Sequence, residues 1–472
     1  EGVDSISIAL DLIFKQSIQN CEIPEDWKLA NVVPIFKKGS KKDVSNYRPV
    51  SLTSLVCKIL EKVIKAKMQS YLDENDLIGK SQHGFREGKS CLTNLLSFLE
   101  FVTNNLDNGD GVDVVYLDFS KAFDKVPHMR LMHKVRNLGV SNSVSNWMEV
   151  WLSDRKQRVI LYGKKSEWKQ VLSGVPQGSV LGPLLFIIYV NDLDWGLKNK
   201  VWKFADDTKL AAPVSKCTDS FSLQKDLDKL LSWADRWQME FNVKKCKVMH
   251  FGPSNINFGY DFSGEWLNVV KEEKDLGIII SDDSKFHKQC IEARYKANKM
   301  LGVINRNVSY KSREVICKLY NSFVRPHLEY CVQAWSPYYL QDLDMLEKVQ
   351  RRATKLVSGI ENLEYDQRLK ELNMFSIKRR FLRGDMIHVF KLSQEPDDST
   401  LNELFELSNS QQTRGHCKKI IKKGCRLDLR KSFFSQRVVN LWNSLPNDVI
   451  ESNSLQTFKH RLDQHMNAVG LI

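Results

Sequence analysis

The chain has 472 residues, of which 42% are hydrophobic and 27% are charged, close to the average of globular proteins. No apolar run reaches the roughly 18 residues that a membrane-spanning helix needs, so no membrane partner is expected. A chain this long exceeds what one hydrophobic core serves, and several subdomains are expected. Lysine and arginine number 70 against 57 acidic residues, a net charge of +13. This balance favours a polyanionic partner such as nucleic acid over a small neutral ligand.

The ten cysteines are scattered singly, without the paired spacing of a zinc site or the density of a disulfide-rich secreted domain. A reducing, intracellular compartment is therefore expected. The chain begins at Glu1 without an initiator methionine, and its first apolar residues fall at helical spacing, unlike those of a signal peptide. We expect a fragment of a longer polypeptide, in which residues 1–23 form a remnant or linker.

Residues 24–111 alternate short β-rich runs with helical stretches. Ala30–Phe36 has the composition of a strand, and Leu55–Tyr71 has the pattern of a helix. The next run, VDVVYLDF at Val112–Phe119, is nearly all apolar and β-branched around its aspartates. Such a run is typical of a buried central strand.

Three aspartates stand where an ionised side chain needs compensation. Asp118 ends the apolar run, and Asp206 and Asp207 lie at the middle of Val201–Leu210, which predicts a tight β-hairpin. A buried carboxylate is costly unless a cation or hydrogen bonds compensate, and adjacent carboxylates repel each other. Three carboxylates on neighbouring strands could hold two magnesium ions for phosphoryl transfer. An Asp-Asp pair in a turn also occurs for backbone reasons alone.

Beyond about residue 285 the pattern turns helical. Leu343–Val357 places apolar residues on one face and basic residues on another, which predicts a basic amphipathic helix. The segment Arg414–Arg437 holds nine lysines and arginines against one acid, with Phe433 and Phe434 close by. Basic charge with aromatic rings suits a phosphate backbone with stacked bases. A solvated charged face is the alternative.

A set of motifs runs along almost the whole chain. In the N-terminal two thirds they are ANVVPIFKKGS (30–40), NYRPVSL (46–52), QHGFREGKSC (82–91), YLDFSKAFDKVPH (116–128), SGVPQGSVLGPLLF (173–186), KFADDTKL (203–210), FNVKKCKVMHFG (241–252) and EKDLGI (273–278). In the C-terminal third they are VRPHLEYCVQAW (324–335), LEKVQRRATKLV (346–357) and RVVNLWNSLP (437–446). In this order they resemble the reverse transcriptases of LINE-like non-LTR retrotransposons, particularly the jockey and chicken-repeat groups.

The resemblance implies an α+β, right-hand polymerase fold. Residues 24–111 would form the fingers, and 112–284 the palm, an antiparallel sheet with helices on one face. Part of 136–170 is a candidate for the fingers as well. Residues 285–395 would form a helical thumb, and 396–472 a small basic C-terminal region.

The resemblance also implies catalytic roles. The three aspartates, Asp118, Asp206 and Asp207, would be the metal ligands. Lys245 follows an asparagine at the place where the family keeps a lysine, and it would protonate the pyrophosphate leaving group. Lys244 and Lys247 are close enough in the sequence to leave this register open.

Further residues are candidates for substrate contact by the same resemblance. Those for the incoming nucleotide are Lys37, Arg48, Phe119, Phe123, Gln177 and Gly178. Those for template or primer are Gly174, Pro176, Arg351, Arg352, Lys418, Lys419, Lys422 and Lys423. The two fingers cations would grip the triphosphate, and Phe123 would lie under the nucleotide sugar. The alternatives are surface salt bridges for the cations, core packing for Phe123 and a plain turn for 174–178.

The function implied is that of an RNA-directed DNA polymerase, a nucleotidyltransferase using two Mg²⁺ ions, with Mn²⁺ as a substitute. Its expected partners are an RNA template, a DNA primer or nicked target DNA, deoxynucleoside triphosphates, and the element RNA in a ribonucleoprotein. Nucleus and cytoplasm are the expected locations. No segment resembles an endonuclease or a zinc knuckle, so target-site nicking is not expected.

Two alternatives stay open. The first is a catalytically silent mobile-element remnant that only binds RNA, against which the intact carboxylates argue. The second is a group II intron maturase or telomerase-like polymerase, which fits the palm motifs but not those of the C-terminal third.

Overall fold

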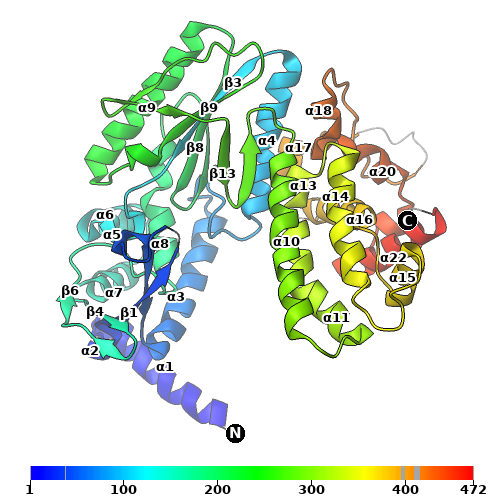
Figure 1. Cartoon of the computed structure of the whole chain (residues 1–472). Helices are drawn as coiled ribbons and strands as arrows, with labels where there is room; N and C mark the ends of the chain where they lie inside the picture. The colour runs from blue at the N-terminus through cyan, green and yellow to red at the C-terminus, as the bar shows by residue number, and fades with distance from the viewer. Residues whose placement is uncertain (1, 38, 395–398, 409–414, 471–472) are drawn as a thin grey trace.

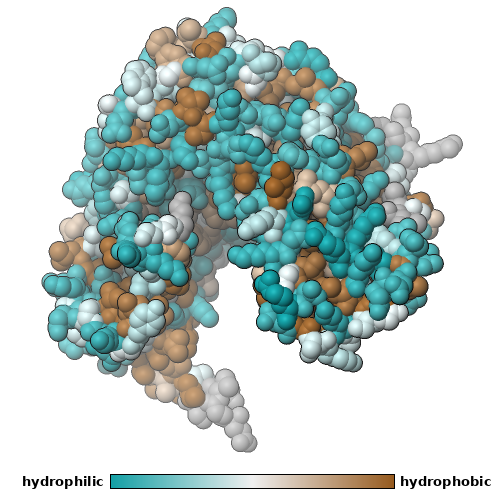
Figure 2. Space-filling model, in the orientation of Figure 1, coloured by the Kyte–Doolittle hydropathy of each residue, from teal (hydrophilic) through white to brown (hydrophobic). Residues whose placement is uncertain are grey.

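The computed structural model describes residues 2–37, 39–394, 399–408 and 415–470. Arg414 and the predicted domain boundary at 395/396 lie outside these residues. Figure 1 shows a central sheet above an N-terminal module, with a helical module beside them and the C-terminal helices behind it. Figure 2 shows an open notch between the N-terminal module and the helical module. The molecule therefore has a broad opening beneath the central sheet.

The N-terminal module is built on a small mixed sheet in the order β2-β1-β4-β5, with β6 paired to β4. Strand β1 (Leu29–Phe36) is antiparallel to β2 (Tyr47–Leu52) and parallel to β4 (Lys156–Leu161). The strand predicted at Ala30–Phe36 is confirmed, and a segment far along the chain completes its sheet. The other elements are α1 (Gly2–Asn20), α2 (Glu25–Lys28), a 3-10 turn (Val44–Asn46), α3 (Leu55–Glu74), α5 (Ala122–Lys125), α6 (His128–Asn137), α7 (Asn142–Leu152), β5 (Lys164–Lys165) and β6 (Lys169–Gln170).

The central sheet has the strand order β12-β9-β3-β8-β7, and β3 is antiparallel to both of its neighbours. All seven residues of β3 are buried, which explains the apolar run in the sequence. The predicted central strand and hairpin are both confirmed. The strands are β3 (Gly111–Leu117), β7 (Lys200–Phe204), β8 (Asp207–Val214), β9 (Lys247–Phe251) and β12 (Asn268–Val269). Around them lie α4 (Cys91–Asn108), α8 (Gly182–Tyr189), α9 (Cys217–Trp237), 3-10 turns at Asn191–Asp194 and Val243–Lys245, and hairpins β10 (Asp261–Phe262) with β11 (Glu265–Trp266) and β13 (Glu272–Asp275) with β14 (Ile278–Ser281).

Helices cover both faces of this sheet, which corrects the expectation of helices on one face. Successive side chains of a strand point to opposite faces. Val112 and Val114 of β3 belong to the core that contains α4, whereas Val115 and Leu117 belong to the core that contains α8 and α9. A strand that is apolar on both faces needs cover on both. The mixed helix-and-sheet fold class itself is confirmed.

The C-terminal half is helical, as predicted. Helices α10, α14 and α16 pack together, and the C-terminal helices contact both α16 and α4. In the described part of the chain, no helix is both long enough and apolar enough to cross a membrane. The helices are α10 (His287–Asn307), α11 (Arg313–Leu319), a π-helical turn (Tyr320–Val324), α12 (Arg325–Glu329), α13 (Val332–Trp335), α14 (Leu340–Thr354), α15 (Tyr365–Leu372), α16 (Ile377–Leu392), α17 (Ser399–Leu404), α18 (Asp428–Ser432), α19 (Phe434–Arg437), α20 (Val439–Ser444), α21 (Asn447–Ile450) and α22 (Leu455–Ala468).

Candidate active site

The three predicted metal ligands lie at one end of two paired strands. Asp118 directly follows β3, Asp207 is the first residue of β8, and Asp206 lies in the tight turn between β7 and β8. Leu117 pairs with Thr208 in the antiparallel ladder, so Asp118 and Asp207 continue the same register. The sheet therefore brings the aspartates of two distant motifs to one edge.

The electrostatics of the aspartates show that their charges are close together. The surrounding protein desolvates Asp206 and raises its pKa, and the charge of Asp118 raises it further. Desolvation, followed by the charges of Asp206, Asp275 and Asp118, raises the pKa of Asp207 to about 7, although this residue still reaches solvent. A cation placed among these carboxylates would relieve the repulsion.

Lys245 contacts this carboxylate edge directly. Its Nζ donates a hydrogen bond to Asp118 Oδ2 at 2.8 Å, and the backbone N–H of Asn242 donates to the Asp118 carbonyl at 2.7 Å. Lys247, a neighbour in the same motif, pairs instead with Glu273. The fold thus brings Lys245, rather than Lys247, to the aspartates. Its role as proton donor stays a prediction.

The aspartates have the chemistry of a magnesium site, since hard divalent cations take carboxylate oxygens as ligands. In residues 2–37, 39–394, 399–408 and 415–470, no three side chains of His, Cys, Asp or Glu are arranged closely enough to hold a metal ion. Asp118 is paired with Lys245 instead. Metal binding at this edge would therefore need the carboxylates to reorient and Lys245 to release Asp118.

The two predicted fingers cations face this edge from the N-terminal module. Arg48 lies on β2 and Lys37 directly follows β1, and both side chains are exposed. The charges of both act to lower the pKa of Asp206, against the larger effect of desolvation. Both cations are therefore close enough to Asp206 to influence its charge.

The loop with the motif SGVPQGS packs against two backbone segments of the N-terminal module, Ser51 of β2 and Phe123–Asp124 of α5. Gly174 has φ +90, and a Cβ there would lie 2.7 Å from backbone atoms of Phe123 and Asp124. Gly178 has φ +120, and a Cβ there would clash with the Ser51 carbonyl of β2. The side chain of Gln177 donates to Asp124 Oδ1 at 3.1 Å. Close backbone packing explains both glycines, while substrate contact by Gly174, Pro176, Gln177 and Gly178 stays a prediction.

The two predicted aromatic contacts differ in placement. Phe119 is 3% exposed and stacks on Phe241 at a ring distance of 4.3 Å, so its side chain is part of the core. Its expected role as a nucleotide contact stays a prediction. Phe123 is half-buried and stacks on Phe186 at 4.4 Å. Core packing supports one side of the Phe123 ring, and the predicted contact with the sugar stays open.

The basic segment near the C-terminus is more deeply tied into the fold than predicted. Phe433 and Phe434 are buried, so they cannot stack on bases. Arg430 is buried against Glu100 of α4, and Arg437 pairs with the buried Asp385 of α16. Internal ion pairs therefore account for part of the charge that suggested a nucleic-acid surface.

The predicted template contacts lie in two places. Arg351 and Arg352 are exposed on α14, the predicted amphipathic helix. Three of the four C-terminal lysines have internal partners: Lys418 donates to Ser393 O at 3.3 Å, Lys422 to Asn440 Oδ1 at 3.0 Å, and Lys423 pairs with Glu406 at 3.2 Å. Lys419 also has an interaction within the chain. Template contact by these lysines stays a prediction.

The sequence motif QHGFREGKSC had no assigned role, and the structure supplies one. Gln82 is fully buried, and its Oε1 accepts hydrogen bonds from the N–H groups of Ala205 at 3.0 Å and Gly84 at 2.8 Å. Ala205 has φ +57, and a Cβ on Gly84 would lie 2.5 Å from its nitrogen. This loop thus supports the turn that carries Asp206. A glutamine two residues before a glycine was the signal in the sequence.

Glu61 of α3 is a second supporting residue that the sequence did not indicate. Its Oε2 accepts hydrogen bonds from the backbone N–H groups of Val180 at 2.6 Å and Leu181 at 3.1 Å, just before α8. Burial raises the pKa of Glu61, and these N–H groups oppose the shift. The carboxylate therefore anchors the loop that follows Gln177 and Gly178.

Comparison with known proteins shows that the sequence is similar to those of RNA-directed DNA polymerases. A family model described as reverse transcriptase (RNA-dependent DNA polymerase) matches residues 37–304. The RNA-directed DNA polymerase from mobile element jockey of Drosophila melanogaster is 25% identical over 408 residues, which cover 82% of this chain and 44% of the relative. The same-named protein of Drosophila funebris is 27% identical over 372 residues, covering 75% of this chain and 40% of the relative. The chain thus spans about two fifths of the length of these relatives.

Among solved structures, apo telomerase from Candida tropicalis is 12% identical with a TM-score of 0.44, covering 84% of this chain and 73% of that one. This likeness is too weak to assign a fold by itself. The family match extends from Lys37 into α10 and spans more than half of the chain. The resemblance predicted from the motifs is confirmed, and the chain belongs to the reverse transcriptase (RNA-dependent DNA polymerase) family.

Proposed function

We propose that this chain is an RNA-directed DNA polymerase that extends a DNA 3′-hydroxyl on an RNA template. The observation that carries the proposal is the carboxylate edge of Asp118, Asp206 and Asp207, opposed by the cations Lys37 and Arg48, in a member of this family. An edge of carboxylates facing cations suits a metal-bound triphosphate, because the metal binds the carboxylates and the cations bind the phosphates.

The basic residues of the site would have different roles in the reaction. Arg48 offers a fork of N–H donors that fits phosphate oxygens, and Lys37 adds a second positive charge. Lys245, released from Asp118, would hold a proton at its Nζ for the departing pyrophosphate. Two Mg²⁺ ions, or Mn²⁺ in their place, would activate the primer hydroxyl and stabilise the charge on the phosphates.

The partners of this activity are part of the proposal. They are an RNA template, a DNA primer or nicked target DNA, and deoxynucleoside triphosphates, with the element RNA bound as a ribonucleoprotein. The net charge of +13 supports a polyanionic partner. We place the protein in the nucleus and cytoplasm.

Primer extension on an RNA template, with Mg²⁺ and deoxynucleotides, tests the proposal. Asp206→Asn should abolish extension, because a lost metal ligand removes several kcal/mol of transition-state stabilisation. RNA affinity should stay within about twofold, since it rests on many phosphate contacts. Asp228→Asn, which removes an exposed carboxylate of α9, is the matched control and should extend normally.

Two results would count against the proposal. An Asp206→Asn protein that keeps most of its activity would exclude Asp206 as a metal ligand. A wild-type protein that binds RNA without extending any primer would favour the alternative, a silent remnant that only binds RNA.

A further inference from the structure

The side chain of Asp124 contacts the loop with the motif SGVPQGS. Asp124 belongs to the short helix α5, directly after Phe123, and it is half-buried. Its Oδ1 accepts a hydrogen bond from Gln177 Nε2 at 3.1 Å, a contact between two motifs whose residues are 53 positions apart. The sequence motifs indicated a role for Gln177 and for Phe123 but none for Asp124. The contact therefore joins a residue without a role to a predicted nucleotide contact.

Main-chain acceptors hold the loop independently of the Asp124 carboxylate. Ser173 Oγ donates a hydrogen bond to the Asp124 carbonyl at 2.9 Å. The N–H of Val175 donates to the Phe123 carbonyl at 2.8 Å. Both acceptors remain when the side chain of Asp124 is replaced. A substitution of Asp124 is therefore expected to act on the side chain of Gln177 rather than on the path of the loop.

Gln177 is held at both ends, by β2 at its main chain and by Asp124 at its side chain. The N–H of Ser51 in β2 donates to the Gln177 carbonyl at 2.7 Å. The side chain is half-buried and reaches solvent. A glutamine side chain loses much of its rotamer freedom when its end is fixed. The hydrogen bond to Asp124 therefore fixes the last free part of this residue.

The chemistry of the carboxylate determines which end of the amide faces it. An ionised carboxylate only accepts hydrogen bonds, so the NH₂ group of Gln177 must face Asp124 and its Oε1 is directed away. Burial raises the pKa of Asp124, and the hydrogen bond from Gln177 and the charges of Lys121 and Lys37 act against this shift. These neighbours favour the ionised form, which is the form that fixes the amide.

Asp124 and the carboxylate edge are influenced by the same fingers cation. The charge of Lys37 acts to lower the pKa of Asp124 and also that of Asp206. Phe123, the predicted sugar contact, is the residue before Asp124. The fixed amide of Gln177 therefore lies beside residues to which the proposed function assigns the incoming nucleotide.

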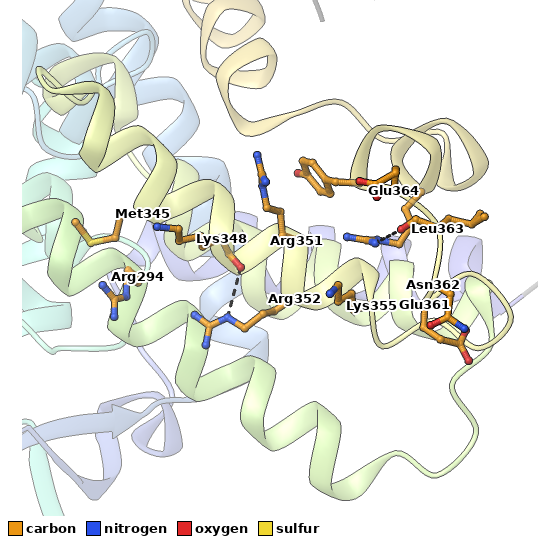
Figure 3. A pocket seen from close by; sticks show the side chains of 12 residues that line it. Arg294, Met345, Lys348, Arg351, Arg352, Lys355, Glu361, Asn362, Leu363 and Glu364 are labelled. Carbon is orange, nitrogen blue, oxygen red and sulfur yellow. Dashed lines mark hydrogen bonds between the residues drawn. The ribbon is translucent and has the colours of Figure 1, made fainter.

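A neutral amide needs a fixed orientation more than a cation does. The predicted template contacts Arg351 and Arg352 are exposed on α14 and line a wide pocket (Figure 3). A guanidinium carries only donors, so every one of its nitrogen atoms suits a phosphate. An amide carries donors at one end and an acceptor at the other, and a half turn exchanges them. Gln177 can therefore offer the wrong group to a ligand unless a partner prevents the turn.

We propose that Asp124 is a positioning residue that keeps the amide of Gln177 in one orientation, with Oε1 available to the incoming nucleotide. The inference rests on the proposed function and on the predicted contact between Gln177 and the nucleotide. Asp124 acts through Gln177 and does not touch the nucleotide itself. Without the carboxylate, the amide turns and presents its oxygen for only part of the time.

Steady-state primer extension on the full chain tests the proposal. Asp124→Leu has a similar size and no acceptor, and it should raise KM for deoxynucleotides about 10-fold, roughly the value of one hydrogen bond. The kcat should stay within about twofold, because a contact made equally before and during the reaction affects KM alone. Asp124→Asn keeps an acceptor oxygen and should stay within about threefold of the wild type. Asp124→Ala repeats the test with a smaller side chain if leucine prevents folding.

A double-mutant cycle separates positioning from a structural role. Gln177→Ala should raise KM at least as much as Asp124→Leu does. Adding Asp124→Leu to Gln177→Ala should then have no further effect, because Asp124 acts through the amide that is already lost. Additive effects would overturn the proposal, and so would an unchanged KM in Asp124→Leu.

A matched control removes another carboxylate that contacts α5. Glu240 is exposed and pairs with Lys125 of α5. Glu240→Leu makes the same change of charge and chemistry as Asp124→Leu and should leave KM within about twofold. An equal rise of KM in this control would overturn the proposal in favour of a general charge effect.

Binding of a nucleotide that cannot be incorporated separates this inference from the proposed function. The probe is a deoxynucleoside α,β-imidotriphosphate, titrated with Mg²⁺ into the protein bound to an RNA template and a DNA primer. Tighter binding by the wild type than by Asp124→Leu, without extension of natural nucleotides, would support the inference and contradict the proposed function. Extension with equal binding by both proteins would overturn the inference alone. A wild type that neither binds the probe nor extends the primer would overturn both.

Discussion

Replacing Gln82 by leucine is expected to disturb the turn that carries Asp206 without changing any carboxylate. Gln82 Oε1 accepts hydrogen bonds from the N–H groups of Ala205 and Gly84, and the side chain is fully buried. Leucine would leave both donors without an acceptor in a place that water does not reach. One buried donor without a partner costs about 1–3 kcal/mol, so two cost about 2–6 kcal/mol.

A change in the conformation of the turn would relieve this cost. Ala205 has φ +57, a conformation that costs a non-glycine residue about 1–2 kcal/mol and persists because its surroundings hold it. Without Gln82 the turn can relax, and Asp206 moves with it. If about 2 kcal/mol of this cost is lost from the geometry that binds Mg²⁺, the apparent Mg²⁺ affinity declines roughly 30-fold, because 1.4 kcal/mol corresponds to a factor of ten.

The assay is the initial rate of primer extension against Mg²⁺ concentration, with RNA affinity and Tm measured on the same preparations. Gln82→Glu is the matched control, because glutamate has the same length and keeps an acceptor oxygen even when it takes up a proton. It should stay close to the wild type in Mg²⁺ dependence. A purely structural role predicts a lower Tm with unchanged Mg²⁺ dependence, and that result in Gln82→Leu would refute the reasoning.

Three further predictions concern other parts of the molecule. Glu100→Gln leaves the buried Arg430 without its charge partner and should lower the free energy of unfolding by about 3–5 kcal/mol in a urea titration; Asp428→Asn, which loses an exposed pair, should cost less than about 1 kcal/mol. Phe123→Ala should raise kcat/KM for ribonucleotides relative to deoxyribonucleotides by about 5- to 150-fold if the ring excludes the 2′-hydroxyl, whereas an unchanged ratio would make it a core residue. Burial lowers the pKa of His83 to about 3, so the unfolded chain takes up a proton below about pH 6.5 that the folded chain refuses, and stability falls as the pH falls. His83→Gln should therefore reduce the loss of unfolding free energy between pH 7 and pH 5 by about 2 kcal/mol, and an unchanged loss would contradict the assignment.

Elements with strong local patterns could be predicted from the sequence. The apolar run before Asp118 is β3, the aspartate pair lies in a hairpin turn, and the amphipathic stretch from Leu343 is α14. Each pattern arises because the buried residues of a strand or helix recur with the period of that element, and this period can be read in the local sequence. The gathering of Asp118, Asp206 and Asp207 at one edge follows from pairing these two strands.

Pairings between distant segments could not be predicted from local patterns. Nothing near β1 indicates that β4 lies parallel to it, since the register is set by contacts between segments far apart in the sequence. The two-sided cover of the central sheet was predictable in principle. All seven residues of β3 are buried, and a strand apolar on both faces must pack on both.

Charge counting over Arg414–Arg437 overstated how much of the positive charge is free of internal ion pairs. A basic residue in a sequence window looks equally available whether it meets water or a buried acid. The acids that neutralise Arg430 and Arg437 are Glu100 on α4 and Asp385 on α16, far outside the window. Such pairs become visible only when the tertiary fold is known.

The same ion pairs connect the helical module to the central sheet. Arg430 joins the C-terminal helices to α4, which packs on the central sheet, and Arg437 joins them to α16 of the helical module. One hydrophobic core runs from the sheet face under α4 through α10 and α14 to α22. Separating the helical module from the sheet would therefore expose apolar core and leave buried charges unpaired, each at a cost of several kcal/mol. The shared core and the two ion pairs accordingly keep the helical module at a fixed position relative to the sheet that carries Asp118.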